Sequence, residues 1–250
     1  MQTNKIALIT GGSRGLGRNM ALAIARKGID VIITYNSNKQ AADDVVAQIE
    51  ELGRKGAAFQ LDTGDVQAFE PFVSDLKKYL TGSGRIDFLI NNAGTALYAP
   101  ATETTEAQLD AIFNIHYKGV FFLTQKLLPH INDGGGIINI SSGLTRITNP
   151  GSSVYGSMKA AVETLTRYLA KELGSRKIRV NVVAPGAVET DFGGGWVRDN
   201  KDRNASIAGI TALGRVGLPD DIGPVVAFLC TDDAYWINGQ RIEVSGGQAI

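Results

Sequence analysis

A tyrosine and a lysine stand four residues apart in the stretch SSVYGSMKAAVETL, which spans residues 152–165. In a helix, positions i and i+4 share one face with Cβ atoms about 5–6 Å apart, so Tyr155 and Lys159 would share one local field. A free phenol has a pKa of about 10 and exchanges protons poorly near neutral pH. Because a fixed ammonium stabilises the phenolate, we expect Lys159 to lower the pKa of Tyr155. The pair predicts a general acid or base; the alternative is an ordinary exposed helix with unrelated side chains.

A glycine-rich turn near the start of the chain indicates where a second reactant binds. The stretch TGGSRGLG, residues 10–17, places Gly11, Gly15 and Gly17 between a predicted strand and a predicted helix. Glycines allow a tight turn and close approach of backbone to a ligand, while the N-terminus of the following helix attracts pyrophosphate. The spacing is wider than in the usual dinucleotide fingerprint, but the physical features are the same. The turn therefore predicts a dinucleotide site.

The end of the second predicted strand bears on which dinucleotide binds. NAD-binding proteins place an acidic residue there, whereas this chain has Tyr35 and Asn36 in the stretch IITYNSNK. No carboxylate at that point repels a 2′-phosphate, Arg14 could pair with it, and Asn36 and Ser37 could donate hydrogen bonds. We therefore favour NADP(H), with NAD(H) as the alternative. In the alternative reading Arg14 is a solvated loop residue, and the other two polar residues only shape a turn.

Two further strand ends hold candidate contacts. Asp62 closes the third predicted strand, where its carboxylate could accept a hydrogen bond from an adenine amino group. It could equally be a turn residue before the helix that Asp65 caps. The stretch NNAG, residues 91–94, closes the fourth strand, and its small residues suit either backbone held close to a ligand or a plain loop.

The elements that must position these residues alternate along the chain. Apolar runs typical of strands buried on both faces of a parallel sheet lie at 5–10, 30–35, 57–62, 87–94, 136–142, 178–186 and 240–247. Helical patterns lie between them at 15–28, 38–53, 65–80, 103–129, 153–175 and 219–230. The alternation predicts an α/β fold, a single-domain Rossmann-type doubly wound parallel sheet of about seven strands with helices on both faces. One dinucleotide-binding and catalytic domain would then span residues 1–250.

The composition excludes several classes of partner. Twenty-five basic and twenty-five acidic residues cancel, so no overall field favours nucleic acid or an anionic membrane. The single cysteine, Cys230, permits no internal disulfide and indicates a reducing compartment. Neither a signal peptide nor a membrane-spanning stretch is evident, so we expect a cytoplasmic protein. His116 and His130 have no further ligands at metal-binding spacing, so no metal site is expected.

The segment at about 189–215 breaks the alternation. It contains three consecutive glycines, then Trp196, then a run of charged residues. Long segments of this kind in compact domains are usually lids, binding loops or disordered stretches. We expect a mobile substrate lid here, with a floppy surface loop as the alternative. Leu144 and Ile147, in the stretch GLTRITNPG, and Trp196 are candidate apolar walls of a substrate pocket, or else ordinary loop packing.

Together these motifs resemble the short-chain dehydrogenase/reductase family over nearly the whole chain. The matching motifs are TGGSRGLG, NNAG, Asn114 in FNIHYKGV, Ser142 in NISS, YGSMK and PGAVET at 185–190. Ser142 precedes Tyr155 by 13 residues and Lys159 follows it by four, which is a specific spacing.

The resemblance implies a role for each candidate catalytic residue. Tyr155 would be the general acid for carbonyl reduction and the base for the reverse reaction. Lys159 would lower the pKa of Tyr155 and hold the nicotinamide ribose hydroxyls, and Ser142 would donate a hydrogen bond to the substrate oxygen. Asn114 would anchor a water that links Lys159 to solvent.

The resemblance also implies a set of cofactor-binding residues. They are Gly11, Ser13, Arg14, Gly15, Leu16, Gly17, Asn36, Ser37, Asp62, Thr63, Asn92, Ala93, Gly94, Tyr155, Lys159, Pro185, Gly186, Val188 and Thr190. Of these, Val188 and Thr190 would contact the nicotinamide carboxamide. The cofactor would supply the hydride, and the protein would supply geometry and a proton.

The expected function is reversible NADP(H)-dependent reduction of a small ketone or β-keto ester to a secondary alcohol. The main alternative is a 3-oxoacyl-[acyl-carrier-protein] reductase of fatty-acid synthesis. Such enzymes usually offer a basic cluster before the serine strand, and LLPHINDGGGIINISS has no Lys or Arg after Lys126. Arg167 and Lys171 on the following helix leave some positive charge. A nucleotide-binding sensor without turnover is a remote alternative, because it should have lost part of the catalytic set.

Assembly follows from the same resemblance, because family members are commonly homotetramers paired through the long helices before and after the serine strand. The predicted 153–175 helix has apolar or small residues on more than one face, which fits burial against both the sheet and a partner. A monomer with an internally covered helix is the alternative.

Overall fold

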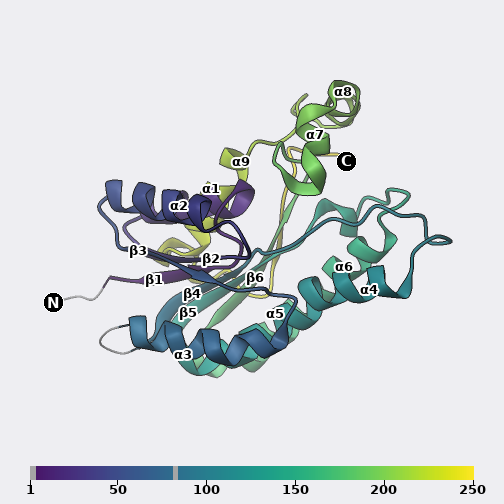
Figure 1. Cartoon of the computed structure of the whole chain (residues 1–250). Helices are drawn as coiled ribbons and strands as arrows, with labels where there is room; N and C mark the ends of the chain where they lie inside the picture. Colours follow the sequence, from purple (N-terminus) through teal and green to yellow (C-terminus); the bar gives the residue numbers. More distant parts are fainter. Residues whose placement is uncertain (1–3, 81–83) are drawn as a thin grey trace.

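The centre of the molecule is a parallel sheet. The computed structural model describes residues 4–80 and 84–250, and in these residues seven strands pair in the order β3-β2-β1-β4-β5-β6-β7 (Figure 1). The strands are β1 (Ile6–Ile9), β2 (Asp30–Tyr35), β3 (Gly56–Gln60), β4 (Ile86–Asn91), β5 (Ile131–Ile140), β6 (Arg179–Pro185) and β7 (Arg241–Val244). Each pairing is parallel. The predicted fold class and strand number are confirmed.

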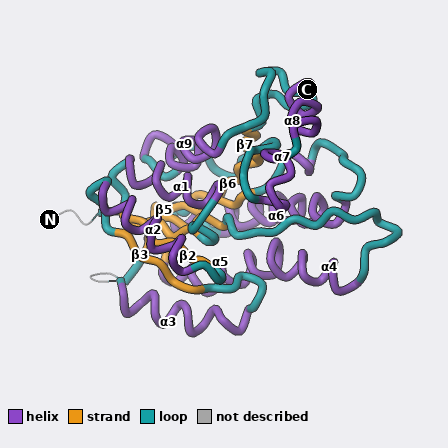
Figure 2. The backbone as a smooth tube through the Cα atoms, turned by 45° about the horizontal axis from the view of Figure 1, so that its top comes forward, coloured by secondary structure: helices purple, strands orange, loops and turns teal. Residues whose placement is uncertain are grey.

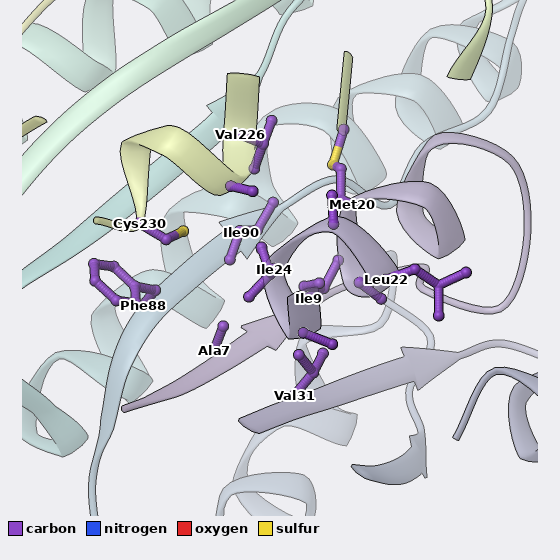
Figure 3. Packing of buried hydrophobic residues seen from close by; sticks show 14 of the residues in the cluster. Ala7, Ile9, Met20, Leu22, Ile24, Val31, Phe88, Ile90, Val226 and Cys230 are labelled. Atoms are coloured by element: carbon purple, nitrogen blue, oxygen red, sulfur yellow. The ribbon is translucent and has the colours of Figure 1, made fainter. Parts of the chain in front are cut away.

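Helices cover both faces of this sheet (Figure 2). One layer consists of α1 (Gly15–Arg26), α2 (Lys39–Glu51) and α9 (Pro219–Leu229), and the other of α3 (Phe69–Tyr79), α4 (Glu106–Phe113), α5 (Gly119–Leu127) and α6 (Ser153–Glu172). Successive residues of β1 point into different layers: Ala7 and Ile9 join the core under α1 and α9, while Leu8 joins the core on the other face. Figure 3 shows the first core, in which Met20 and Ile24 of α1 pack near Val226 of α9.

The predicted helix at 103–129 is divided into parts. It begins after Thr105, whose side chain forms a capping box with Gln108, and continues as α4. A π-helical turn at Asn114–Lys118 then joins α4 to α5. Gly119 packs so closely on the Thr63 carbonyl that a Cβ there would lie 2.0 Å from its oxygen. Such π-helical turns inside α-helices frequently mark functional sites.

The segment expected to be a substrate lid contains two helices. A short turn at Phe192–Gly195, in which three glycines take positive φ, leads into α7 (Trp196–Asp199) and α8 (Lys201–Gly209). The Asn200 side chain caps α8 by accepting a hydrogen bond from the Arg203 N–H at 2.9 Å. In Figure 1 these two helices stand apart from the helical layers.

Two features of residues 4–80 and 84–250 concern a membrane and metal ions. No helix in these ranges is both long enough and apolar enough to cross a membrane. The same residues hold no group of three or more His, Cys, Asp or Glu side chains arranged to bind a metal ion.

Candidate active site

The candidate residues collect at one edge of the sheet, because the carboxyl ends of parallel strands all meet there. The turn after β1 is the glycine loop (residues 10–17), and NNAG follows β4. Ser142 follows β5, and PGAVET follows β6. The strands β1 and β4 are neighbours, but the strand that follows β1 in sequence and the strand that follows β4 lie on opposite sides of this pair. In open α/β sheets, ligands usually bind in the crevice at the carboxyl ends of two such strands.

The glycine loop has the geometry that a pyrophosphate requires. Gly11 and Gly15 have φ of +65° and +53°, and a Cβ at Gly17 would lie 2.1 Å from the Gly11 carbonyl oxygen. Arg14 occupies the N-cap of α1 and makes no side-chain capping bond there. The first N–H groups of a 12-residue helix are thus left for an anionic ligand. These residues fit the phosphates of a dinucleotide.

Thr10, which the sequence analysis did not single out, ties the glycine loop to NNAG. Its hydroxyl oxygen accepts hydrogen bonds from the backbone N–H groups of Asn92 and Ala93, both at 3.0 Å. The Asn92 side-chain amide donates to the carbonyls of Thr10 and Gly11 at 2.9 and 3.1 Å. Thr63 lines one small cavity together with Thr10 and Ala93. A threonine directly after an apolar strand was the only sequence signal for this role.

The residues that favour NADP(H) follow β1 and β2, and a backbone hydrogen bond joins the chain after β1 to the end of β2. The Gly12 N–H donates to the Thr34 carbonyl at 2.8 Å. Arg14 lies two residues after Gly12, and Asn36 lies two residues after Thr34. Arg14, Asn36 and Ser37 are all exposed. Nearby, the Asp62 carboxylate accepts a hydrogen bond from the Gly64 N–H at 2.8 Å, the bond expected of a turn residue.

Two of the predicted catalytic side chains are buried on α6. Tyr155 is 8 % exposed and Lys159 is 5 % exposed. The Lys159 ammonium donates to the Ile140 carbonyl at 2.7 Å and lies 5.7 Å from the centre of the Tyr155 ring. Ser142 caps the turn after β5, where its hydroxyl oxygen accepts from the Leu144 N–H at 3.2 Å. The end of β5 and the start of α6 therefore bring Ser142, Tyr155 and Lys159 together.

Burial decides the ionisation of this pair. It raises the pKa of Tyr155 above its ordinary value, the Tyr98 phenol raises it further, and a hydrogen bond with Ser142 opposes the rise. Burial also lowers the pKa of Lys159 to about 7. The expectation that Lys159 lowers the pKa of Tyr155 is therefore wrong for this structure. The ammonium faces the Ile140 carbonyl and lies beside the phenol ring.

His116 contacts Tyr155. The two rings lie 5.1 Å apart, edge to face, and the His116 Nε2 lies 2.7 Å from the Thr95 carbonyl oxygen. Burial lowers the pKa of His116 to about 3, so this ring is neutral near pH 7. Asn114 is the first residue of the π-helical turn that contains His116, and its role in anchoring a water stays a prediction. A lone histidine in an apolar segment gave the sequence analysis no spacing to recognise.

The segment after β6 closes over the glycine loop. Thr190 is buried, and a Cβ at Gly15 would lie 3.7 Å from the Thr190 Cβ. The Gly186 N–H donates to the Val244 carbonyl at 3.0 Å, and Val188 forms a bridge with Gly217. Pro185 is buried at the end of β6. The contacts that the resemblance implies between this segment and the nicotinamide stay a prediction.

Aromatic rings line the side of the site that faces the lid. The Phe192 ring lies 5.9 Å from the Tyr155 ring. Trp196 packs edge-on against Tyr98 at 5.4 Å, and the Arg203 guanidinium lies 4.6 Å over the Trp196 ring.

The predicted apolar wall residues Leu144 and Ile147 lie on the turn that follows Ser142, both half-buried. The sequence analysis named Trp196 but missed Tyr98, which packs against Trp196, and Phe192, which packs against Tyr155.

Comparison with known proteins identifies the family. A family model described as enoyl-(acyl carrier protein) reductase matches residues 11–249. The chain belongs to the short-chain dehydrogenase/reductase family. It is therefore an oxidoreductase by family, and the resemblance inferred from its motifs is confirmed.

Several members of this family are similar over nearly their whole length. An uncharacterised oxidoreductase of Methylorubrum extorquens is 41 % identical over 244 residues, 97 % of each chain. The tetrahydroxynaphthalene reductase PfmaG of Pestalotiopsis fici is 39 % identical, over 97 % of this chain and 91 % of its own.

Among solved structures, the reductase LugOII, which catalyses keto-reduction at C1 during lugdunomycin biosynthesis, has a TM-score of 0.93 at 39 % identity, covering 99 % and 98 % of the two chains. The landomycin C-6 ketoreductase LanV, solved with NADP and rabelomycin, has a TM-score of 0.89 at 35 % identity, covering 99 % and 97 %.

Proposed function

We propose that this chain catalyses the reversible NADP(H)-dependent reduction of a ketone to a secondary alcohol, with Tyr155 as the general acid. The observation that supports this most is that buried Tyr155 and Lys159 lie together with Ser142, which is hydrogen-bonded to Tyr155, at the edge of the sheet that holds the tightly packed glycine loop. The presence of the whole set argues against a sensor without turnover.

The ionisation of the site fits reduction. The raised pKa keeps the Tyr155 hydroxyl protonated at neutral pH, so it can donate to a carbonyl oxygen as negative charge develops there. The Ser142 hydroxyl accepts the Leu144 N–H and shares a hydrogen bond with Tyr155, so when a substrate binds it can turn its own hydrogen to the same oxygen. The nicotinamide would supply the hydride. Lys159 and Thr190 are the residues of this chain that would hold it.

The choice of NADP(H) rests on the outer end of the glycine loop. Arg14 is exposed beside the β2 end, where Asn36 and Ser37 replace the acidic residue of NAD-binding proteins. A guanidinium pairs well with a phosphate because the bonds are charge-assisted. The similar ketoreductase LanV was solved with bound NADP, which supports the same choice.

The substrate that we propose is a small ketone or β-keto ester, and the aromatic rings of Tyr98, Phe192 and Trp196 favour one that bears an aromatic ring. The names of relatives agree, since PfmaG is a tetrahydroxynaphthalene reductase and LanV was solved with rabelomycin. A 3-oxoacyl thioester is the competing substrate, and the assay below includes one.

We also propose a cytoplasmic homotetramer paired through α4, α5 and α6. Leu109, Phe122 and Tyr168, one on each of these helices, are exposed large apolar side chains. Apolar residues of this size on a shared layer suit a partner surface. Size-exclusion chromatography with light scattering would show four chains, and a monomer at micromolar concentration would contradict this assembly.

The proposed function is tested by following NADPH and NADH oxidation with an aryl ketone, a simple β-keto ester and an acetoacetyl thioester. We expect turnover of the first two, with NADPH preferred. A strong preference for the thioester would assign the chain to fatty-acid synthesis. Preference for NADH would contradict the role given to Arg14, and no oxidation of either cofactor with any ketone would contradict the proposal.

A further inference from the structure

A third side chain lies on the same face of α6 as the proposed acid and its lysine. Glu163 follows Lys159 by four residues and Tyr155 by eight, so the three share one side of the helix. The Glu163 side chain is only 12 % exposed. A carboxylate buried this far is costly unless hydrogen-bonded partners surround it.

The partners of Glu163 lie on both sides of Ser142. Its Oε1 accepts hydrogen bonds from the hydroxyls of Ser141 at 2.7 Å and Thr145 at 2.8 Å. It also accepts from the Arg241 Nε at 2.8 Å. We call residues 141–146 the serine turn. One carboxylate oxygen therefore ties the serine turn, on both sides of its catalytic residue, to the helix that holds Tyr155.

Glu163 is the first member of a row of alternating charges. Arg241 donates to Glu243 at 2.8 Å, and Glu243 accepts two bonds from Arg146, at 2.5 and 3.0 Å. We call Glu163, Arg241, Glu243 and Arg146 the charge ladder. Hydrogen bonds from Arg146 hold the pKa of Glu243 at about 2, so its carboxylate stays ionised near neutral pH. The ladder runs from α6 across β7 and returns to the serine turn, where Arg146 lies.

The far end of the charge ladder reaches the segment after β6. Arg146 donates to the carbonyls of Gln248 and Ala249 at 2.7 and 2.9 Å. The Gln248 side-chain oxygen in turn accepts from the Ala187 N–H at 2.9 Å. The serine turn, α6 and the segment that would hold the nicotinamide are thus joined by one chain of contacts.

We propose that Glu163 is a positioning residue for Ser142, and that the charge ladder fixes the serine turn against Tyr155 and Lys159. This inference rests on the proposed function, because it assigns Glu163 to the same reaction. Glu163 touches neither the proposed acid nor the substrate site; it acts through Ser141, Thr145 and Arg241. If the charge of Glu163 is removed, we expect α6 to keep its position and the serine turn to become more mobile, because the bonds from Ser141 and Thr145 weaken.

The test compares Glu163→Gln and Glu163→Ala with Glu172→Gln, which removes the same charge from an exposed position on α6. Each variant is made with and without Ser142→Ala. Alone, Ser142→Ala should lower kcat by about 10²–10³-fold, as expected for a lost oxyanion donor. Glu163→Gln should lower kcat by about tenfold with the KM for NADPH unchanged. If it acts through Ser142, adding Ser142→Ala to Glu163→Gln should lower kcat by only about 10–10²-fold more, about tenfold less than Ser142→Ala costs alone.

Independent effects of the two sites would overturn the proposal. If Ser142→Ala costs the same in the Glu163→Gln background as alone, Glu163 does not act through Ser142. The same conclusion follows if Glu163→Gln behaves like Glu172→Gln. Glu163→Gln keeps the size of the side chain, so it answers the question even if Glu163→Ala fails to fold.

Hydrogen–deuterium exchange separates this inference from the proposed function, since it needs no turnover. In Glu163→Gln, amides of the serine turn should exchange faster while those of residues 91–94 stay unchanged. Unchanged exchange in the serine turn would overturn the positioning role. If the wild-type chain reduces no ketone, the proposed function fails, and exchange still decides whether Glu163 fixes the turn.

Discussion

The glycine loop and the serine turn lie at the same edge of the sheet, yet different interactions hold each in shape. In the glycine loop the contacts are backbone hydrogen bonds and close glycine packing, as at Gly17 and Thr10. In the serine turn they are charged side chains from distant parts of the chain, such as Glu163 and Arg241, which are 78 residues apart. We expect the fold of the glycine loop to tolerate a change of surface charge but no added Cβ, and the fold of the serine turn to show the reverse.

The largest effect should come from the catalytic side of this comparison. Tyr155→Phe should lower ketone turnover by about 10²–10⁴-fold, because it removes the proton that the carbonyl oxygen must receive. NADPH binding, followed by fluorescence titration, should change little. Turnover near the wild-type rate would show that another group supplies the proton.

A single added methyl group at Gly17 should disturb the packing of the glycine loop. Gly17→Ala places a Cβ 2.1 Å from the Gly11 carbonyl oxygen, so α1 must shift away from the loop. Overpacking of this kind costs about 1–3 kcal/mol, which should weaken NADPH binding by about 5–150-fold. Gly209→Ala, at a position with no atom within 4 Å, is the matched control. Equal affinity in both variants would contradict the packing argument.

In the glycine loop, Arg14 is the charged residue that we expect to bind the 2′-phosphate of NADPH. Arg14→Ala should raise the KM for NADPH by about 10–150-fold, because it removes a charge-assisted bond of about 1.5–3 kcal/mol. The KM for NADH should stay the same, since NADH lacks the 2′-phosphate. Arg26→Ala, another exposed arginine on α1, serves as the control. A parallel loss with both cofactors would assign Arg14 to the pyrophosphate.

Lys159 should make the stability of the protein depend on pH. Its pKa is about 7 when folded against 10.5 ordinarily, so between these values the unfolded chain binds more protons than the folded one. The free energy of unfolding should therefore rise from pH 7 to pH 9, by up to about 1.4 kcal/mol per pH unit.

This rise should be absent from Lys159→Met, with urea unfolding as the measurement. Above pH 9 the buried Cys230 thiol, whose pKa is raised to about 12 from 9.0, adds an opposite trend. Identical slopes in the two proteins between pH 7 and 9 would show that Lys159 titrates as an exposed lysine.

The smallest effect should come from the lid. Trp196→Ala removes the contact with Tyr98, and an aromatic pair is worth about 0.5–1.5 kcal/mol, so the KM for an aryl ketone should rise by about 2–13-fold. The KM for NADPH should not change. Trp236→Ala, which alters a tryptophan that is 88 % exposed, is the control. A larger effect at Trp236 would contradict the assignment of the lid.

The glycine loop and the serine turn also differ in how much of each could be predicted from the sequence. Strands, most helices and the glycine loop were predictable because their signals are local: apolar runs, glycine spacing and a following helix. Thr10 and His116 were missed because their partners lie 82 and 21 residues away, at Asn92 and Thr95. The charge ladder is hidden for the same reason.

Two expectations, a lowered pKa for Tyr155 and a continuous helix at 103–129, are wrong because residue spacing does not reveal burial or local backbone geometry. The pKa of Tyr155 rises because the pair is buried, which residue spacing alone does not reveal. The predicted helix at 103–129 gave no sign of the π-helical turn that sets His116 against Tyr155. The expected lid at about 189–215 stays a prediction; it contains α7 and α8, after glycines that turn the chain sharply.

The central claim is tested most directly by following deuterium from NADPH dideuterated at the nicotinamide C4 into the product of an aryl ketone. We predict an alcohol with one deuterium on its carbinol carbon from the wild-type protein, and almost none from Tyr155→Phe in the same time. An unlabelled alcohol, or full labelling by Tyr155→Phe at the wild-type rate, would contradict the account.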